Sequence, residues 1–273
     1  MTRILAAAAS EARIALRNRW VAITVAMMAV FSIVLSAMGS APTGELGADR
    51  LSVTVASLTS LAVYLVPLIA LLMSFDAIAG EIERGTLPLV LTYPVGRFEL
   101  LVGKFVAHLA ILALAVAVGY GLAAAFAFWG DARAGQGVAA LLRLLWTSLL
   151  LGAAFLAIGY ALSALARRPG AAAGMAIGLW LVMIVLYDLG LLAAIVADGG
   201  GFFTTHVFPW LLIANPADAF RLYNLAASEA TAAAAGLGGA AATLDPLHAL
   251  ASIMIWPLLG LGLATLAFRR VVP

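Results

Sequence analysis

Six long runs of apolar residues, separated by polar or glycine-rich segments of different lengths, dominate the pattern of this chain. The runs are uniformly apolar and do not alternate, so the pattern does not indicate a β-barrel. A helix that crosses a bilayer needs about 20 apolar residues. The sequence therefore predicts an all-α, polytopic membrane protein with six transmembrane helices. The predicted spans are residues 20–38, 51–75, 103–129, 138–166, 171–197 and 247–268.

Composition points the same way. Hydrophobic residues make up 65% of the chain and charged residues 10%, against about 45–50% and about 25% in soluble domains. A mean hydropathy of +1.12 also excludes the soluble enzyme folds. The net charge of +2 is too small to indicate a nucleic-acid partner. The chain has no cysteine, which excludes disulfides and thiolate metal sites.

The basic residues orient the spans. Cytoplasmic connections of membrane proteins carry an excess of arginine and lysine. We therefore expect both termini to be cytoplasmic and the protein to be a multi-pass protein of the inner (plasma) membrane. The basic residues expected inside are Arg3, Arg13, Arg17, Arg19, Arg84, Arg97, Lys104, Arg167, Arg168, Arg269 and Arg270, against Arg50, Arg133, Arg143 and Arg221 outside.

Residues 1–273 are predicted to form a single transmembrane domain, with three segments that lie outside the spans. Residues 1–19 carry small and apolar side chains at helical spacing, with arginines elsewhere around the helix. They predict either an amphipathic helix at the membrane interface or a plain basic topology signal. Residues 76–102 form a cytoplasmic loop, and residues 198–246 form an extracytoplasmic loop.

The cytoplasmic loop has the most informative local chemistry. We expect the second span to continue as helix to about Arg84, with Gly85 as the left-handed residue that ends it. Thr86 is placed to cap a short new helix that has Pro88 in its first turn. This helix carries apolar side chains in a water-facing loop, so it must lie in the headgroup layer or dock on a partner. The apolar side chains are Leu87, Leu89, Val90, Leu91 and Tyr93.

This loop carries a resemblance to a known family. The order Glu-x-Glu-x-Gly-Thr-Leu from Glu81, then Tyr-Pro-x-x-Arg from Tyr93, then Gly103-Lys104 opening a span, resembles permeases of the type-2 ABC exporter superfamily. The resemblance implies that the loop holds the coupling helix, which contacts a separate ATPase subunit. The docking residues that it implies are Glu81, Glu83, Gly85, Thr86, Leu87, Leu89, Val90, Leu91, Tyr93, Pro94 and Arg97.

Shorter pieces over nearly the whole length narrow the resemblance to one subgroup. Among them are Phe75-Asp76-Ala77-Ile78, Leu91-Thr92-Tyr93-Pro94 and Asn215-Pro216-Ala217-Asp218. They are similar to the permeases that serve maturation of the copper site of nitrous-oxide reductase. That likeness implies a homodimer in the lipid bilayer, a NosF-like cytoplasmic ATPase and a NosD-like periplasmic protein. The alternatives are an ABC exporter of a lipid, drug or other solute, and a stand-alone ion-coupled transporter that uses Asp188.

The chain itself has no predicted catalytic, metal or cofactor site. A phosphate-binding loop needs Gly-x-x-x-x-Gly-Lys-Ser/Thr. The single lysine, Lys104, is followed by Phe105, and Phe98 stands where the first glycine belongs. We therefore expect ATP and magnesium to be bound by a partner subunit, and Lys104 to snorkel at the inner membrane face. The three histidines show no metal-ligand spacing.

Polar residues near the outer face give two further expectations. Asp188 lies inside the fifth span, where it is either a functional group or a structural contact, and Arg143 is its candidate partner. Asn215-Pro216-Ala217-Asp218 predicts a helix start after an apolar segment at the outer interface. This region is either a lid on the bundle or a contact for a periplasmic partner. The candidate contact residues are Phe208, Trp210, Asn215, Asp218 and Arg221.

Overall fold

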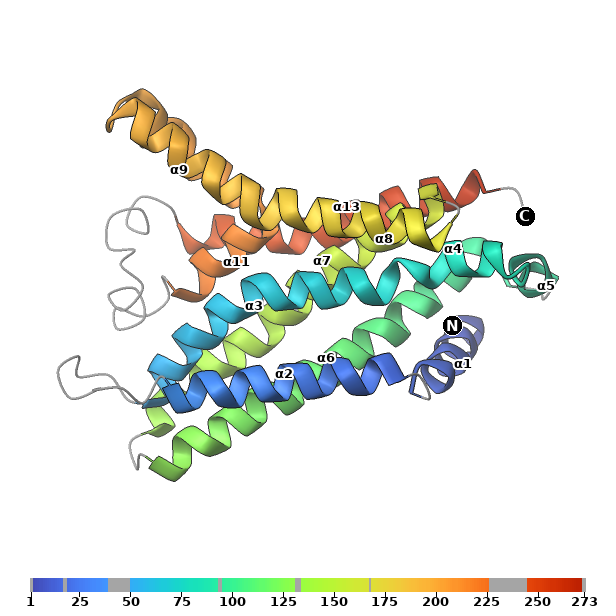
Figure 1. The fold of residues 1–273 in the computed structure, drawn as a ribbon, viewed down its shortest axis with the longest axis horizontal. Coiled ribbons are helices and arrows are strands. Elements are labelled where there is room, and N and C mark those ends of the chain that lie inside the picture. The colour runs from blue at the N-terminus through green and yellow to red at the C-terminus, as the bar shows by residue number, and fades with distance from the viewer. Residues whose placement is uncertain are drawn as a thin grey trace.

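The computed structural model describes residues 2–16, 19–38, 50–92, 95–130, 134–166, 168–225 and 245–271. These residues form helices and short connections, and no strand occurs among them. The helices run roughly parallel or antiparallel in an elongated bundle (Figure 1). The prediction of an all-α membrane protein is confirmed.

The apolar runs are continuous helices. Five helical stretches in the described part of the chain are long and apolar enough to cross a membrane. A sixth helix, α2, has 20 residues and corresponds to the first predicted span. The spans are α2 (Arg19–Met38), α3 with α4 (Arg50–Ser74, Asp76–Glu83), α6 (Arg97–Gly130), α7 (Val138–Ala166), α8 with η2 and α9 (Pro169–Trp180, Leu181–Leu186, Tyr187–Asp198) and α13 (Pro246–Arg269).

The fourth span, α7, is the centre of the bundle. In its most apolar stretch of 18 residues, 72% is buried inside the bundle, whereas the equivalent stretch of the fifth span is only 11% buried. Glycines let neighbouring helices approach α7 closely. A Cβ on Gly260 of α13 would meet the backbone nitrogen of Ile158 at 3.1 Å. Phe155 and Tyr160 are fully buried in the same region.

The two ends of the bundle carry different short elements. The helices α1 (Thr2–Leu16) and α5 (Leu87–Leu91) lie at one end, together with the last turn of α13 (Figure 1). The opposite end carries η1 (Ala134–Gly137), η3 (Phe203–Val207), α10 (Phe208–Ala214) and α11 (Pro216–Leu225). This matches the predicted arrangement, in which both chain ends share a face with the loop at 76–102.

The fifth span is interrupted in its middle. Residues Leu181–Leu186 form a π-helical turn, η2, between the α-helical segments α8 and α9. A π-turn has hydrogen bonds between residues five positions apart and occurs inside α-helices, frequently at functional sites. The α9 segment ends at Gly199, which has the left-handed φ of 57°. The chain then turns back through η3 and α10 beside α9 (Figure 1).

Candidate functional site

The loop after the second span is a helix–turn–helix that presents α5 at the end of the bundle. The helix α4 ends at Glu83, and Gly85 has a φ of 65°, the left-handed conformation predicted for it. Glycine adopts this conformation without the Cβ penalty of other residues. Pro88 occupies the first turn of α5, also as expected.

The turn is held by the backbone of Glu81. The carbonyl oxygen of Glu81 accepts hydrogen bonds from the Thr86 amide at 3.0 Å and from the Thr86 hydroxyl at 3.3 Å. The prediction that Thr86 caps α5 with its side chain is therefore wrong, since no cap hydrogen bond forms. The hydroxyl points back to α4 and closes the turn, so α5 is fixed to the helix that precedes it.

Glu81 is also joined to the bundle by its side chain. Lys104 of α6 lies 2.8 Å from Glu81 and 2.9 Å from Glu11 of α1, and its side chain is only 6% exposed. The prediction that Lys104 snorkels to the membrane face is wrong, because two carboxylates from separate helices hold it in the interior. Beside Lys104, the His108 ring and the Tyr160 hydroxyl form a hydrogen bond of 2.6 Å. Lys104 thus links α1, α6 and the base of the α4–α5 turn.

A serine on the central span fixes the start of α4. The second span breaks at Phe75, so the first amides of α4 have no carbonyl partner in the preceding helix. The Ser163 hydroxyl of α7 accepts hydrogen bonds from the amides of Ile78 at 3.0 Å and Ala79 at 2.9 Å. Sequence patterns did not indicate this contact, which spans 85 positions. These two hydrogen bonds attach α4 to the central span α7.

Arg97 has a structural role at the base of α6. Its guanidinium group donates hydrogen bonds to the carbonyl groups of Phe268 at 2.9 Å, Arg269 at 3.2 Å and Val271 at 2.7 Å. These carbonyls lie at the C-terminal end of α13, where a cation is also favoured by the helix dipole. Arg97 thus caps the last span, and its predicted contact with a partner stays a prediction.

The predicted docking residues divide into an anchor and an exposed face. Leu87 is fully buried and holds α5 against the bundle, so it is not free to contact a partner. Leu89 is 65% exposed on the opposite side of α5. Val90 and Leu91 are half-buried, and Glu83 is exposed beside the turn. Tyr93 and Pro94 lie outside the described residues. Among the predicted docking residues, the exposed side chains are therefore the apolar Leu89 and the acidic Glu83.

At the opposite end, Asp188 is paired with a residue other than the expected one. Its carboxylate lies 3.5 Å from the guanidinium group of Arg221 on α11, and Asp218 lies 3.7 Å from the same group. The expected partner, Arg143, forms no ion pair with Asp188 among the described residues. Burial, followed by repulsion from Asp188, raises the pKa of Asp218 from 3.8 to about 8, against the attraction of Arg221.

The predicted outer contact residues mostly face inward. Asn215 and Asp218 are 3% and 2% exposed, so they are buried by the chain itself. The side chain of Asn215 accepts a hydrogen bond from the Ala217 amide at 2.9 Å, as predicted for a helix start. Arg221 is engaged with the two aspartates. This leaves Phe208 and Trp210 of the predicted set, both on α10.

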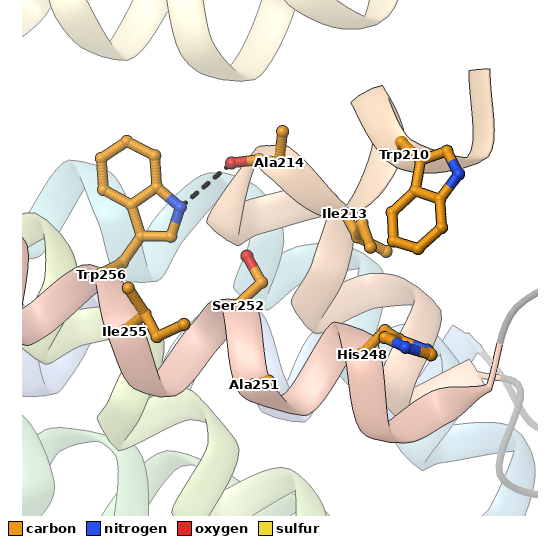
Figure 2. Close-up of a pocket in the computed structure, with 8 residues that line it drawn as sticks. All are labelled: Trp210, Ile213, Ala214, His248, Ala251, Ser252, Ile255 and Trp256. Atoms are coloured by element: carbon orange, nitrogen blue, oxygen red, sulfur yellow. Dashed lines mark hydrogen bonds between the residues drawn. The ribbon is translucent and has the colours of Figure 1, made fainter. Parts of the chain in front are cut away.

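Trp210 borders an open, apolar pocket between α10 and α13. The pocket has a volume of about 290 Å³ and lies near the outer end of the last span, where the Trp210 and His248 rings meet edge to face (Figure 2). The indole nitrogen of Trp256 donates a hydrogen bond to the Ala214 carbonyl at 3.0 Å and closes the other end of the pocket.

Comparisons with known proteins agree over nearly the whole chain. The model of the ABC-2 family transporter protein family matches residues 5–271. A Pseudomonas aeruginosa protein described as a probable ABC transporter permease protein NosY is 45% identical over 260 residues, which cover 93% of this chain and 94% of that protein. A protein of the same description from Stutzerimonas stutzeri is 42% identical over 274 residues, which cover 99% of each chain.

Proposed function

Because the chain belongs to the ABC-2 family of transporter proteins, we propose that α5 docks a separate ATPase and that the bundle carries the effect of ATP hydrolysis to the opposite membrane face. The chain is an ABC transporter permease, a multi-pass protein of the inner membrane. The observation that supports docking best is the construction of the α4–α5 turn. A short helix with Leu89 65% exposed is held from behind by buried Leu87, Glu81 and Lys104.

A surface built in this way suits the transmission of force. Movement of α5 reaches Glu81 through the Thr86 hydrogen bonds, and Glu81 passes it to α6 and α1 through Lys104. Ser163 carries it to the central span through the amides of α4. An element supported only by flexible contacts would absorb the movement of an ATPase instead. The partner is a NosF-like ATPase, which binds the ATP and magnesium.

The process served is maturation of the copper site of nitrous-oxide reductase, with a NosD-like protein on the periplasmic side. Support comes from the two relatives described as NosY, which align along almost the whole chain. Export of a lipid, drug or other solute by the same architecture is the alternative, and the copper content of the reductase distinguishes the two. The ion-coupled alternative is weakened because Arg221 already neutralises Asp188.

The permease works as a homodimer in which the fifth span faces its counterpart. Only 11% of this span's most apolar window is buried within one copy. A Cβ added at Gly174, Gly178 or Gly190 of this span would meet open space. Glycine at helix surfaces in a membrane favours close packing on another helix over contact with lipid. A groove of about 370 Å³ beside Gly190 and Leu186 offers room for such a helix.

Co-purification tests the docking proposal. Leu89→Asp places a charge on the exposed face of α5, where burial against a partner would cost several kcal/mol. We expect this variant to reach the membrane at the normal level and to lose the ATPase during purification. Phe98→Asp is the matched control, since Phe98 is 56% exposed at the start of α6 and lies outside α5. Retention of the ATPase by Leu89→Asp, or equal loss in both variants, would show that α5 is not the docking element.

A further inference from the structure

Two side-chain-to-backbone hydrogen bonds attach the outer helices, α10 and α11, to the fifth span. The side chain of Asn215, at the bend between α10 and α11, donates a hydrogen bond to the Met183 carbonyl at 2.6 Å. Met183 belongs to the π-turn η2 in the middle of the fifth span. Four residues further along the span, the Tyr187 hydroxyl donates to the Leu211 carbonyl of α10 at 2.7 Å.

A charged group completes this attachment. The guanidinium group of Arg221 lies between two carboxylates, Asp188 of the span at 3.5 Å and Asp218 of its own helix at 3.7 Å. Asp218 is 2% exposed, and its second carboxylate oxygen is buried without a hydrogen-bond partner. Near neutral pH the Asp218 carboxyl is mostly protonated, because its pKa is raised to about 8, so Arg221 carries the ionic contact chiefly to Asp188. Arg221 is the one cation paired with either carboxyl group among the described residues.

The last turn of α11 is hydrogen-bonded to the central span. The side chain of Asn224 donates a hydrogen bond to the Thr147 hydroxyl of α7 at 3.0 Å. Phe220 and Leu222 are buried beside it. The short helix thus bridges the well-buried fourth span and the little-buried fifth span. α11 also packs on α13 and α3. A displacement of the fifth span relative to the fourth must therefore shift α11 or break polar contacts at one of its ends.

We propose that Asp188, Arg221 and Asp218 form a latch that makes α11 follow the movement of the fifth span. Asp188, an acid inside a transmembrane helix, is thereby a positioning residue for the outer helices. The proposal rests on the proposed function, because it assumes that ATP turnover moves the fifth span. It goes beyond that function by naming the contact that carries the movement to the outer face.

Hydrogen exchange of the reconstituted complex of permease and ATPase tests the latch. In the wild-type complex we expect ATP to change exchange both in the peptides of α4–α5 and in those of α11. In Arg221→Gln without nucleotide, exchange in α11 should rise on the order of tenfold, because one attachment is lost. With ATP, the response of α4–α5 should persist and the response of α11 should vanish. The reciprocal swap, Asp188→Arg with Arg221→Asp, should restore the response of α11.

The remaining outcomes separate the two proposals. Arg143→Gln removes an arginine from the same end of the bundle without touching the latch, and it should behave as the wild type. Asp188→Asn provides a second break should Arg221→Gln fail to assemble. A purely structural role for Arg221 predicts faster exchange but an unchanged response of α11 to ATP, and this result would overturn the latch. A wild-type complex in which α4–α5 responds to ATP and α11 does not would also overturn it. No response in either segment would refute the proposed function, and the latch with it.

Discussion

Replacement of Lys104 by methionine tests the connection between the α4–α5 turn and the bundle. Methionine keeps the length and apolar stem of lysine and removes only the charge. Glu81 and Glu11 would then lie side by side in the interior without a cation. Their side chains are 14% and 19% exposed, so water gives them little compensation.

The size of the effect follows from this burial. Removing one partner of a buried ion pair costs about 3–5 kcal/mol, because the other charge stays desolvated. Glu11→Gln is the matched control, since it leaves the Lys104–Glu81 pair intact. That variant loses one charged hydrogen bond, worth roughly 1.5–3 kcal/mol. The neutral triple variant, with Glu11→Gln, Glu81→Gln and Lys104→Met, should recover most of the loss because no buried charge remains.

Thermal unfolding in detergent measures the relative stabilities of these three variants and the wild type. A loss of 3–5 kcal/mol corresponds to a fall in Tm of roughly 6–20 °C for a chain of about this size. We expect Lys104→Met to melt lowest, Glu11→Gln to lie between it and the wild type, and the triple variant to melt above Lys104→Met. If Lys104→Met melts within a few degrees of the wild type, Lys104 is solvated and does not join the three helices.

Three further predictions concern single contacts. Ser163→Ala leaves the amides of Ile78 and Ala79 without an acceptor. The free energy of unfolding should fall by about 1–3 kcal/mol, measured as a lower Tm, and ATPase binding should weaken in a pull-down. An unchanged Tm and unchanged ATPase binding would contradict the role of Ser163. Gly260→Leu forces a side chain against Ala157 at 2.7 Å and should destabilise the bundle by about 1–3 kcal/mol, whereas Gly262→Leu, which enters open space, should not; equal Tm values for both would refute the close packing of α7 and α13. Burial raises the pKa of Asp218 to about 8 in the folded protein, so its contribution to the free energy of unfolding is fully present below about pH 4 and is lost as the pH rises through 8. Asp218→Asn should therefore flatten the fall of Tm over that range. An unchanged dependence of Tm on pH would count against this assignment.

The spans were predictable from sequence because hydropathy depends on the residue itself. The fourth span has the predicted bounds, and the first, fifth and last spans differ by one or two residues at their ends. The start of α6, the break at Phe75 and the π-turn η2 were not predicted. The bend at Gly85 was also predictable, since it needs only a local conformation that glycine favours.

The partners of the charged residues could not be predicted in the same way. Lys104 pairs with Glu11, which is 93 positions away, and Arg97 caps a helix that ends more than 170 positions later. Asn215 and Asp218 form a helix start that looks exposed in the sequence, and only tertiary packing shows that it is buried. A local pattern fixes the type of an element, while its polar contacts depend on which helices pack together.

The copper content of nitrous-oxide reductase tests the whole account most directly. The measurement compares denitrifying cells in which this chain, or its Leu89→Asp variant, replaces the native permease. We predict that the wild-type chain supports a fully loaded reductase and that Leu89→Asp, present in the membrane at the same level, yields reductase protein without its copper site. A fully loaded reductase in the Leu89→Asp cells would contradict docking through α5. A reductase without copper in the wild-type cells would contradict the proposed role in copper-site maturation.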